Sequence, residues 1–192
     1  SAALFFAAAA ALNPLCLALA APALAVLLGY SYTKRFTALA HLWLGFALGI
    51  SPVGAWAAAT GRLAVPPVVL GLGVMAWVAG FDIVYSLQDE AFDRAHGLHS
   101  IPARLGAARA LAVARWLHVL AVLCFLGFAV LAGGGPWRLA AVALAAALLL
   151  WQHRLVRPDD LSRVDAAFFT ANGALSVVMC VLFVFAKIVP GP

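Results

Sequence analysis

The chain has 192 residues, of which 66% are hydrophobic and 10% are charged, and its formal net charge is +5 at pH 7. Soluble domains carry about 25% charged residues, and the mean hydropathy of this chain is +1.06, so the composition excludes a soluble globular protein and predicts a membrane protein. Because no soluble basic region is present, the positive charge does not indicate nucleic-acid binding; it fits contact with the headgroups of a lipid bilayer.

Apolar stretches of about 20 residues predict membrane-spanning helices, because such a helix crosses a hydrocarbon core of about 30 Å. Residues 1–12 are apolar but predict a helix of only about 18 Å, so we interpret them as the end of a span that begins upstream. Ser1 in place of methionine agrees with a chain that begins inside a longer protein. The apolar run is not preceded by the basic residues that begin a secretory signal peptide, so we do not expect such a signal. Six full spans follow, near residues 14–31, 38–60, 66–86, 107–131, 137–155 and 165–188.

These spans predict an all-α fold, a polytopic transmembrane helical bundle that forms one domain over residues 1–192. If the spans alternate in direction, nine Lys and Arg residues fall on one side of the membrane and only Arg62, Arg138 and Lys187 fall on the other. Cytoplasmic loops carry the excess of basic residues. All seven acidic residues fall on the side with nine basic residues, so we expect the chemistry at the cytoplasmic face.

Three carboxylates lie at the end of the third full span. In a helix that advances about 100° per residue, Asp82 and Asp89 are about 20° short of two full turns apart, and Asp93 follows one turn later. Carboxylates on one stripe repel one another unless a cation lies between them, and hard oxygen ligands suit Mg²⁺ that bridges to a diphosphate. A solvated helix end that leaves the membrane is the alternative interpretation.

The inner loop after this stripe is basic. It carries Arg94, His96, His99, Arg104 and Arg109. One guanidinium group can donate to two phosphate oxygens at once, and carboxylates can hold Mg²⁺. Acidic and basic residues in one loop therefore favour binding of a metal-bound polyphosphate over binding of a bare cation. The two histidines lack the thiolates or the HExxH pattern that indicate zinc, and we expect them to cap or brace the loop.

Three further features concern packing and anchoring. Residues 30–36 add Lys34 and Arg35 to the inner surface, where such residues often serve only as anchors. Gly45 and Gly49 form a small-xxx-small pair that predicts close helix contact, and Asn172 within the last span predicts an interhelical hydrogen bond. The three cysteines lack disulfide or metal spacing and are expected to be small buried side chains: Cys16, Cys124 and Cys180.

One pattern resembles a known family. The spacing Asp82-x2-Tyr85-x3-Asp89-x3-Asp93, followed by Gly-Leu-His-Ser-Ile-Pro-Ala-Arg-Leu-Gly at 97–106, is similar to the second aspartate-rich motif of the UbiA superfamily of membrane prenyltransferases. Residues 30–36 and 49–56 resemble stretches of its bacterial 4-hydroxybenzoate polyprenyltransferase branch. The resemblance covers nearly the whole chain.

The resemblance implies a nine-helix fold around a central cavity, with a first motif of the form Asn-Asp-x-x-Asp in the loop after the second helix. This chain has no counterpart of that motif. Aligning the second motif makes residues 1–12 the end of the third family helix, so the chain corresponds to the C-terminal two thirds of the domain, helices 3–9. We expect such a fragment to lack half of the metal and diphosphate site and to be inactive alone.

The resemblance also implies an enzyme of the bacterial inner membrane, multi-pass, with its active site facing the cytoplasm. Its reaction would be Mg²⁺-dependent transfer of a polyprenyl group from an isoprenyl diphosphate to an aromatic acid, with 4-hydroxybenzoate in ubiquinone biosynthesis as the favoured acceptor. Prenylation in menaquinone biosynthesis by the futalosine route remains an alternative, and so does a membrane transporter without enzymatic activity. A transporter usually places ionisable residues near the bilayer midplane, whereas these acids cluster at the end of a span.

Residue roles follow from the same resemblance. Asp89 and Asp93 would be Mg²⁺ ligands, and Asp82 would be a further ligand or the carboxylate that accepts a phenol proton and steadies the cation. Tyr85 would hydrogen-bond a phosphate or orient a carboxylate, with an interfacial anchor as the alternative.

The basic residues would hold the substrates. Lys34 and Arg104 are expected to bind the diphosphate, and Arg35 is expected to bind the carboxylate of the aromatic acid.

Overall fold

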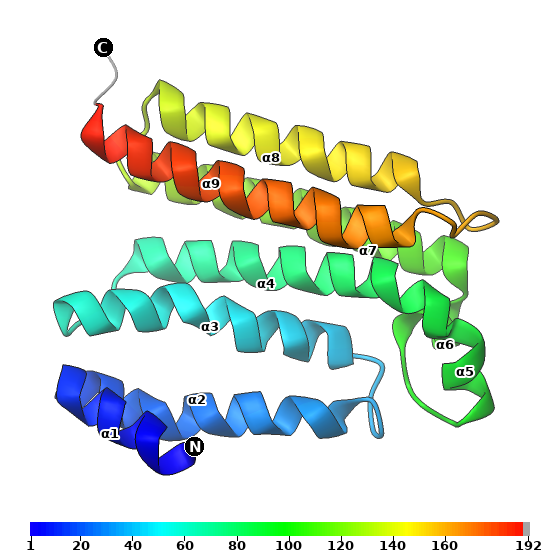
Figure 1. The fold of residues 1–192 in the computed structure, drawn as a ribbon, viewed down its shortest axis with the longest axis horizontal. Helices are drawn as coiled ribbons and strands as arrows, with labels where there is room; N and C mark the ends of the chain where they lie inside the picture. The colour runs from blue at the N-terminus through cyan, green and yellow to red at the C-terminus, as the bar shows by residue number, and fades with distance from the viewer. Residues whose placement is uncertain (190–192) are drawn as a thin grey trace.

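The computed structural model describes residues 1–189 as a bundle of helices (Figure 1). The helices are α1 (Ala2–Leu12), α2 (Pro14–Thr33), α3 (Ala40–Thr60), α4 (Val65–Tyr85), α5 (Glu90–Ala95), α6 (Ile101–Leu105), α7 (Ala107–Leu131), α8 (Pro136–Leu155) and α9 (Ala171–Ile188). A 3₁₀ turn, η1 (Ser86–Asp89), follows α4, and a π-helical turn, η2 (Ala166–Thr170), precedes α9. No β-strand occurs within the described part of the chain, where one isolated bridge joins Arg157 and Asp160, so the all-α prediction is confirmed.

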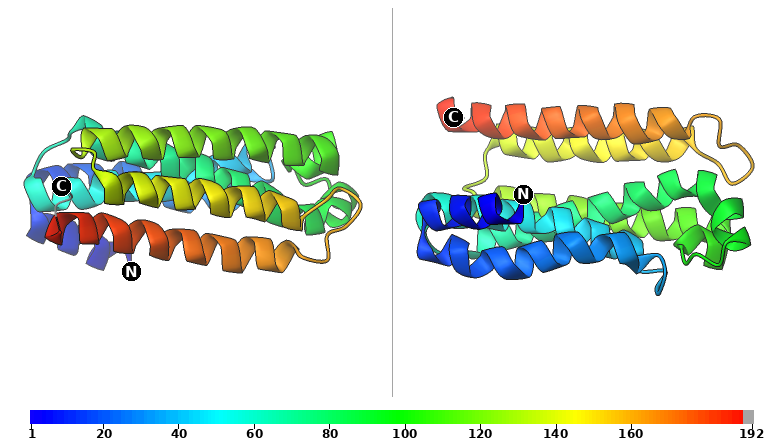
Figure 2. Two further views of the ribbon diagram at one scale, coloured as in Figure 1. Left: turned by 90° about the horizontal axis from the view of Figure 1, so that it is seen from above. Right: turned by 60° about the horizontal axis from the view of Figure 1, so that its bottom comes forward.

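The long helices run side by side and alternate in direction (Figure 1). α8 and α9 form one edge of the bundle in Figure 1 and in the right-hand view of Figure 2. α4 packs between α3 and α7, and α1 and α2 lie at the opposite edge. The ends of α2, α4 and α8 and the beginnings of α3 and α7 lie together on the right of Figure 1. We call this the charged end, because the seven acidic residues of the sequence lie on the segments there.

Five of the six predicted spans are long and apolar enough to cross a membrane: α2, α3, α7, and the continuous helical stretches Val65–Ala95 and Ala166–Ile188. The sixth, α8, has 20 residues but is less apolar, since Arg138 and the run from Gln152 to Arg154 lie at its two ends. α1 is the short apolar helix expected at the start of the chain.

Asn13 separates α1 from α2. Its backbone is extended, and its Oδ1 accepts a hydrogen bond from the Cys16 backbone N–H at 2.9 Å, which caps the first turn of α2. Its Nδ2 donates to the Ala57 carbonyl of α3 at 2.9 Å. One side chain therefore breaks the apolar run of residues 1–33 into two helices and connects the break to α3.

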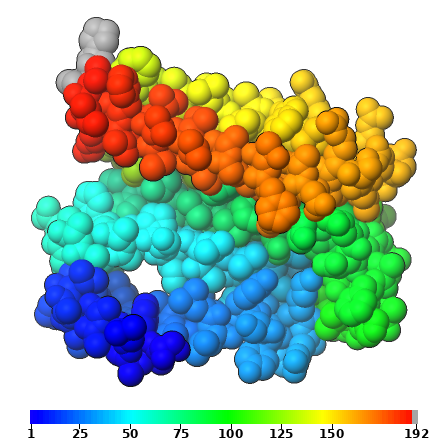
Figure 3. All heavy atoms as spheres, in the orientation of Figure 1, coloured from blue at the N-terminus to red at the C-terminus, as the bar shows by residue number. Residues whose placement is uncertain are grey.

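Near this break, Figure 3 shows the molecule hollowed between α2 and α3. Residues of α1, α2 and α3 line a cavity of about 210 Å³ there.

The contact between α3 and α4 depends on glycines from both helices. A Cβ atom on Gly49 would lie 2.6 Å from the Gly71 carbonyl oxygen, and one on Gly45 would overlap the Met75 carbonyl oxygen. No real Cβ approaches a backbone atom so closely, so the two helix backbones are in direct contact. The prediction of a close approach at Gly45 and Gly49 is confirmed.

Replacing Gly49 by alanine is expected to lower the free energy of unfolding by about 1–3 kcal/mol, because the added methyl must push α4 away. Gly54 on the same helix has no atom within 4 Å of a built Cβ, so Gly54→Ala should leave stability unchanged or slightly raised. Thermal unfolding of both variants in detergent measures the difference. Equal melting temperatures for the two variants would contradict the contact.

The predicted interhelical bond of Asn172 is also present, since Trp77 Nε1 of α4 donates to Asn172 Oδ1 of α9 at 3.0 Å.

The prediction that the three cysteines are buried is wrong. Cys180 is exposed, and Cys16 and Cys124 are only partly buried. Lipid tails are as apolar as a protein core, so an apolar position in a span does not distinguish an interior side chain from one that faces lipid.

Candidate functional site

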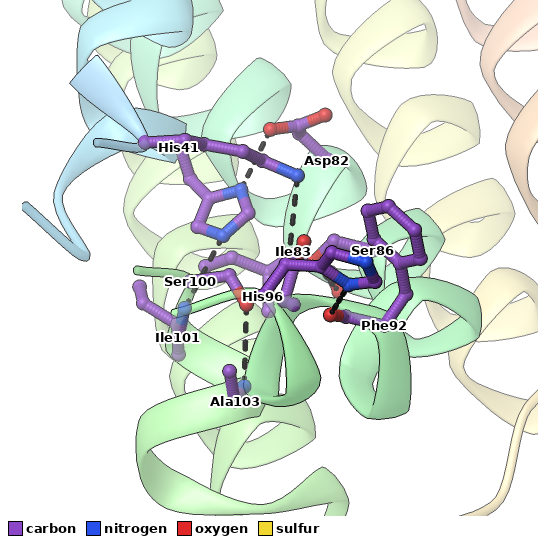
Figure 4. Close-up of polar contacts among 11 residues, drawn as sticks. His41, Asp82, Ile83, Ser86, Phe92, His96, Ser100, Ile101 and Ala103 are labelled. Atoms are coloured by element: carbon purple, nitrogen blue, oxygen red, sulfur yellow. Dashed lines mark hydrogen bonds and ion pairs between the residues drawn. The ribbon is translucent and has the colours of Figure 1, made fainter. Parts of the chain in front are cut away.

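The candidate site lies at the charged end, where the chain between α4 and α7 folds back over the start of α3 (Figure 4). Local sequence explains the fold-back. Gly97 and Gly106 adopt positive φ angles of 65° and 78°, which glycine tolerates. Ser100 caps α6 by accepting from the Ala103 N–H at 3.2 Å, and a proline follows in the first turn of α6. The stretch at 97–106 is therefore a tight turn and a capped short helix.

Asp82 at the end of α4 is held by His41 at the start of α3 (Figure 4). The distance between His41 Nδ1 and Asp82 Oδ2 is 2.6 Å, with His41 fully buried and Asp82 19% exposed. His41 Nε2 accepts the Ile101 backbone N–H at 3.3 Å. Because a neutral imidazole has one acceptor and one donor nitrogen, this N–H places the His41 proton on Nδ1, where it is donated to Asp82. Three segments thus meet at one imidazole.

Asp93 lies on α5 and is 2% exposed, with the Lys34 ammonium 3.6 Å from its Oδ2. The same oxygen is buried and has no hydrogen-bond partner. Lys34 is held from its backbone as well, since its carbonyl accepts the His99 N–H at 2.8 Å. The α2–α3 connection and the loop before α6 are therefore joined at the place where Lys34 meets Asp93.

The single stripe of three acids predicted for a regular helix is not formed. Residues Ser86–Asp89 form a 3₁₀ turn, which advances about 120° per residue and rotates the residues after it by about 80° relative to an α-helix. Asp82 and Asp93 consequently have different partners, and Asp89 is exposed. Within residues 1–189, no three His, Cys, Asp or Glu side chains gather at the spacing of a metal site.

The three acids nevertheless offer oxygens that suit a divalent cation. A buried carboxylate oxygen without a hydrogen-bond partner is an open ligand for a hard metal ion, and Asp93 Oδ2 is such an oxygen. Asp89 precedes it by four residues and is exposed. Asp82 keeps one carboxylate oxygen that His41 does not occupy. A cation bound here would need further oxygens, which a diphosphate supplies.

The predicted basic residues take different positions. Arg104 is exposed and lines a cavity of about 410 Å³ together with Arg94 and His99. Arg94 itself pairs with Glu90 at 2.9 Å and donates from Nε to the Ala103 carbonyl at 2.9 Å. Arg35 is exposed and lies over the Tyr32 ring, 5.7 Å from its centroid. The structure therefore brings Lys34 to the acids, while Arg104 lies at the neighbouring cavity and Arg35 on the outer surface.

Tyr85 and the two loop histidines complete the predicted set. Tyr85 is half-buried and packs on Phe168, with the ring centroids 4.3 Å apart. His96 stacks on Phe92, and its Nδ1 donates to the Phe92 carbonyl at 2.9 Å, while His99 joins the two loops through its backbone. His96 therefore caps its own helix turn, and the contact of His99 with the other loop comes from its backbone.

Sequence reasoning missed His41. A signal was present, because an ionisable residue within an apolar span is a candidate functional residue by default. Its partner could not be identified, because Asp82 lies 41 residues away on another helix.

Residues 1–174 match the model of the UbiA prenyltransferase family. The chain belongs to the UbiA prenyltransferase family. It is similar to the 4-hydroxybenzoate octaprenyltransferases of Aromatoleum aromaticum, with 29% identity over 90% of this chain and 58% of the relative, and of Alkalilimnicola ehrlichii, with 33% identity over 84% and 55%. An apo structure of a UbiA homolog from Aeropyrum pernix K1 superposes with a TM-score of 0.85 and 34% identity, over 97% of this chain and 69% of that chain.

The resemblance carried by the aspartate motif is thus confirmed, and with it the helical UbiA-like architecture of a multi-pass membrane protein. The chain spans a little under three fifths of the length of the octaprenyltransferases that it matches. Since the names of these UbiA relatives describe their whole chains, the substrates and activity of this chain are proposals.

Proposed function

We propose that the protein transfers a polyprenyl group from an isoprenyl diphosphate to an aromatic acid, with 4-hydroxybenzoate as the acceptor and ubiquinone biosynthesis as the setting. The observation that carries this proposal is the buried Asp93 carboxylate beside Lys34, with an oxygen that has no hydrogen-bond partner. A metal diphosphate needs a carboxylate for the metal and a cation for the phosphate. Asp93 and Lys34 supply these two groups 3.6 Å apart. Membership of the family and the names of the relatives support the reaction.

Asp89 and Asp93 would hold Mg²⁺, and Asp82 would use its free oxygen either as a further ligand or as the base that accepts the phenol proton. When bound, the metal supplies Lewis-acid stabilisation of the charge on the departing diphosphate. Lys34, whose ammonium lies 3.6 Å from Asp93 Oδ2, would bind a phosphate oxygen beside that carboxylate. Arg104, exposed at the edge of the 410 Å³ cavity, would bind the second phosphate bidentately.

In the transfer, the bond between the allylic carbon and the diphosphate oxygen breaks, a carbon–carbon bond to the ring forms, and the ring carbon loses its proton. Asp82 would accept the phenol proton as the ring attacks, and when the ring carbon then loses its proton the phenol oxygen regains one, so that one proton in total is released with the pyrophosphate. The hydrogen bond from His41 fixes the orientation of this carboxylate. Tyr85, the last residue of α4, packs on Phe168 and would orient the acceptor. Arg35 would bind the carboxylate of the aromatic acid from the surface loop.

The expected location is the bacterial inner membrane, with the charged end facing the cytoplasm. The excess of basic residues at this end supports that orientation. The apolar bundle would keep the reactive cation from water and give the isoprenoid tail access from the lipid bilayer. A transporter is less well supported, because Asp82, Asp89 and Asp93 lie at or after the end of α4 and not at its middle.

The test is release of pyrophosphate by the full-length protein that contains these residues, in membranes. Release should require an isoprenyl diphosphate, an aromatic acid and Mg²⁺ together, and 4-hydroxybenzoate should be the best acceptor offered. Pyrophosphate release without an acceptor would indicate hydrolysis in place of transfer. Movement of solute without turnover would contradict the enzyme. Transfer to a different aromatic acid would keep the chemistry and change the pathway.

A further inference from the structure

A groove between α7 and α8 lies apart from the acidic site. It has a volume of about 510 Å³, and its walls are mainly apolar. Val119, Leu123 and Leu150 on these walls are exposed on the bundle surface, which faces lipid in a membrane. None of the aspartates of the proposed active site lines the groove. An apolar groove of this kind accepts an acyl chain that lies along the two helices.

Two histidines form the polar floor of the groove. His118 Nε2 donates to the Trp77 carbonyl at 3.3 Å, so its Nδ1 is the acceptor nitrogen of a neutral ring. His153 Nε2 lies 2.8 Å from that Nδ1 and therefore donates to it. This leaves His153 Nδ1 as a buried acceptor, and it has no hydrogen-bond partner in the described part of the chain. A ligand with a hydroxyl group would satisfy this nitrogen.

Two arginines lie at the charged end of the groove. Arg115 and Arg154 both line it and are exposed. The ion pairs formed among residues 1–189 all involve other side chains, and the groove has no acidic lining residue. Trp116 follows Arg115 directly, Trp151 precedes Arg154 by three residues, and both are exposed. Exposed tryptophans are typical of the level of lipid headgroups. The groove thus combines a cationic end at headgroup depth with an apolar body.

We propose that this groove binds one anionic phospholipid with a hydroxylated headgroup, such as phosphatidylglycerol. The phosphate lies between Arg115 and Arg154, a headgroup hydroxyl donates to His153 Nδ1, and an acyl chain follows the apolar walls of α7 and α8. Charge complementarity selects an anion, and the opening of the groove toward lipid selects a membrane component over a soluble phosphate. The bound lipid bridges α8, the least apolar of the long helices, to the rest of the bundle.

The test is lipid titration of the full-length protein that contains these residues, in detergent, followed by native mass spectrometry. Palmitoyl-oleoyl phosphatidylglycerol should bind with a stoichiometry of one, and phosphatidylcholine should bind far more weakly. The double variant Arg115→Gln/Arg154→Gln should weaken phosphatidylglycerol binding on the order of 30-fold. The matched control Arg157→Gln/Arg163→Gln removes two exposed charges from the adjacent loop and should leave binding within about twofold of the parent.

A second comparison tests the hydroxyl contact without changing charge. Phosphatidylmethanol is anionic but has no headgroup hydroxyl, so the unaltered chain should bind it about fivefold more weakly than phosphatidylglycerol. His153→Phe should abolish this difference. An equal loss in both double variants would indicate general surface attraction and overturn the site. Equal affinity of the unaltered chain for the two anionic lipids would overturn the role of His153. Binding of geranylgeranyl diphosphate in place of the phospholipid would overturn the phospholipid site and make the groove an isoprenoid site.

Discussion

Asp93→Asn is expected to lower prenyl transfer by about 100-fold or more while the fold stays intact. Asparagine has nearly the same shape as aspartate, so packing at this 2% exposed position is retained. It lacks the negative charge that a metal ligand needs, and the loss of one electrostatic partner of a developing charge typically costs 10²–10³ in kcat. Loss of the ion pair with Lys34 costs about 1 kcal/mol or less, because Lys34 is one-third exposed.

Turnover of the full-length protein at a series of Mg²⁺ concentrations measures this effect, with the melting temperature as the check on folding. Glu90→Gln is the matched control, since it removes a carboxylate three residues away that pairs with Arg94 at the surface. The control should keep turnover within about twofold. Undiminished Mg²⁺-dependent turnover in Asp93→Asn would exclude Asp93 as a metal ligand, and equal losses in both variants would point to the net charge of the loop.

The membrane spans could be predicted because hydropathy and length are local properties. Five of the six predicted spans meet the criteria for crossing a membrane, and the contact at Gly45 and Gly49 followed from spacing alone. The sequence predicts the boundary between α1 and α2 close to Asn13. It does not predict the contact that fixes this boundary, because Asn13 both caps α2 and donates a hydrogen bond to the Ala57 carbonyl of α3. The misplaced cysteines show the limit of hydropathy, which does not tell interior from lipid-facing positions.

The motif identified the region of the site but not its geometry. The prediction of one carboxylate stripe assumed a regular α-helix through residue 93, and the 3₁₀ turn at Ser86–Asp89 invalidates that assumption. The partners of Asp82 and Asp93 come from the beginning of α3 and the end of α2, respectively. Such long-range pairings depend on how the helices pack, and a single sequence carries little information on packing. The roles of Asp82, Asp89 and Asp93 as metal ligands remain predictions.

His41→Ala is expected to lower the free energy of unfolding by about 2–4 kcal/mol and prenyl transfer by roughly 10–100-fold. The substitution removes a fully buried side chain and leaves the Ile101 N–H without its acceptor, and each such loss costs about 1–3 kcal/mol. It also frees Asp82 to rotate, and the loss of a group that orients a metal ligand typically costs 10–100-fold in activity or metal affinity. Thermal unfolding in detergent and the transfer assay measure the two effects.

Two further substitutions separate packing from hydrogen bonding at this position. His41→Phe fills the space without a donor or an acceptor, so it should restore part of the stability and none of the activity. His41→Gln has an amide that can donate to Asp82 and a carbonyl that can accept from Ile101, so it should recover activity to within about tenfold of the parent. His96→Ala is the control, because this exposed imidazole contacts only its own helix turn and its loss should change stability by no more than about 0.5 kcal/mol. Full activity in His41→Phe would mean that Asp82 needs no hydrogen bond from α3, and the coupling of α3, α4 and the loop before α6 through one imidazole would then be structural only.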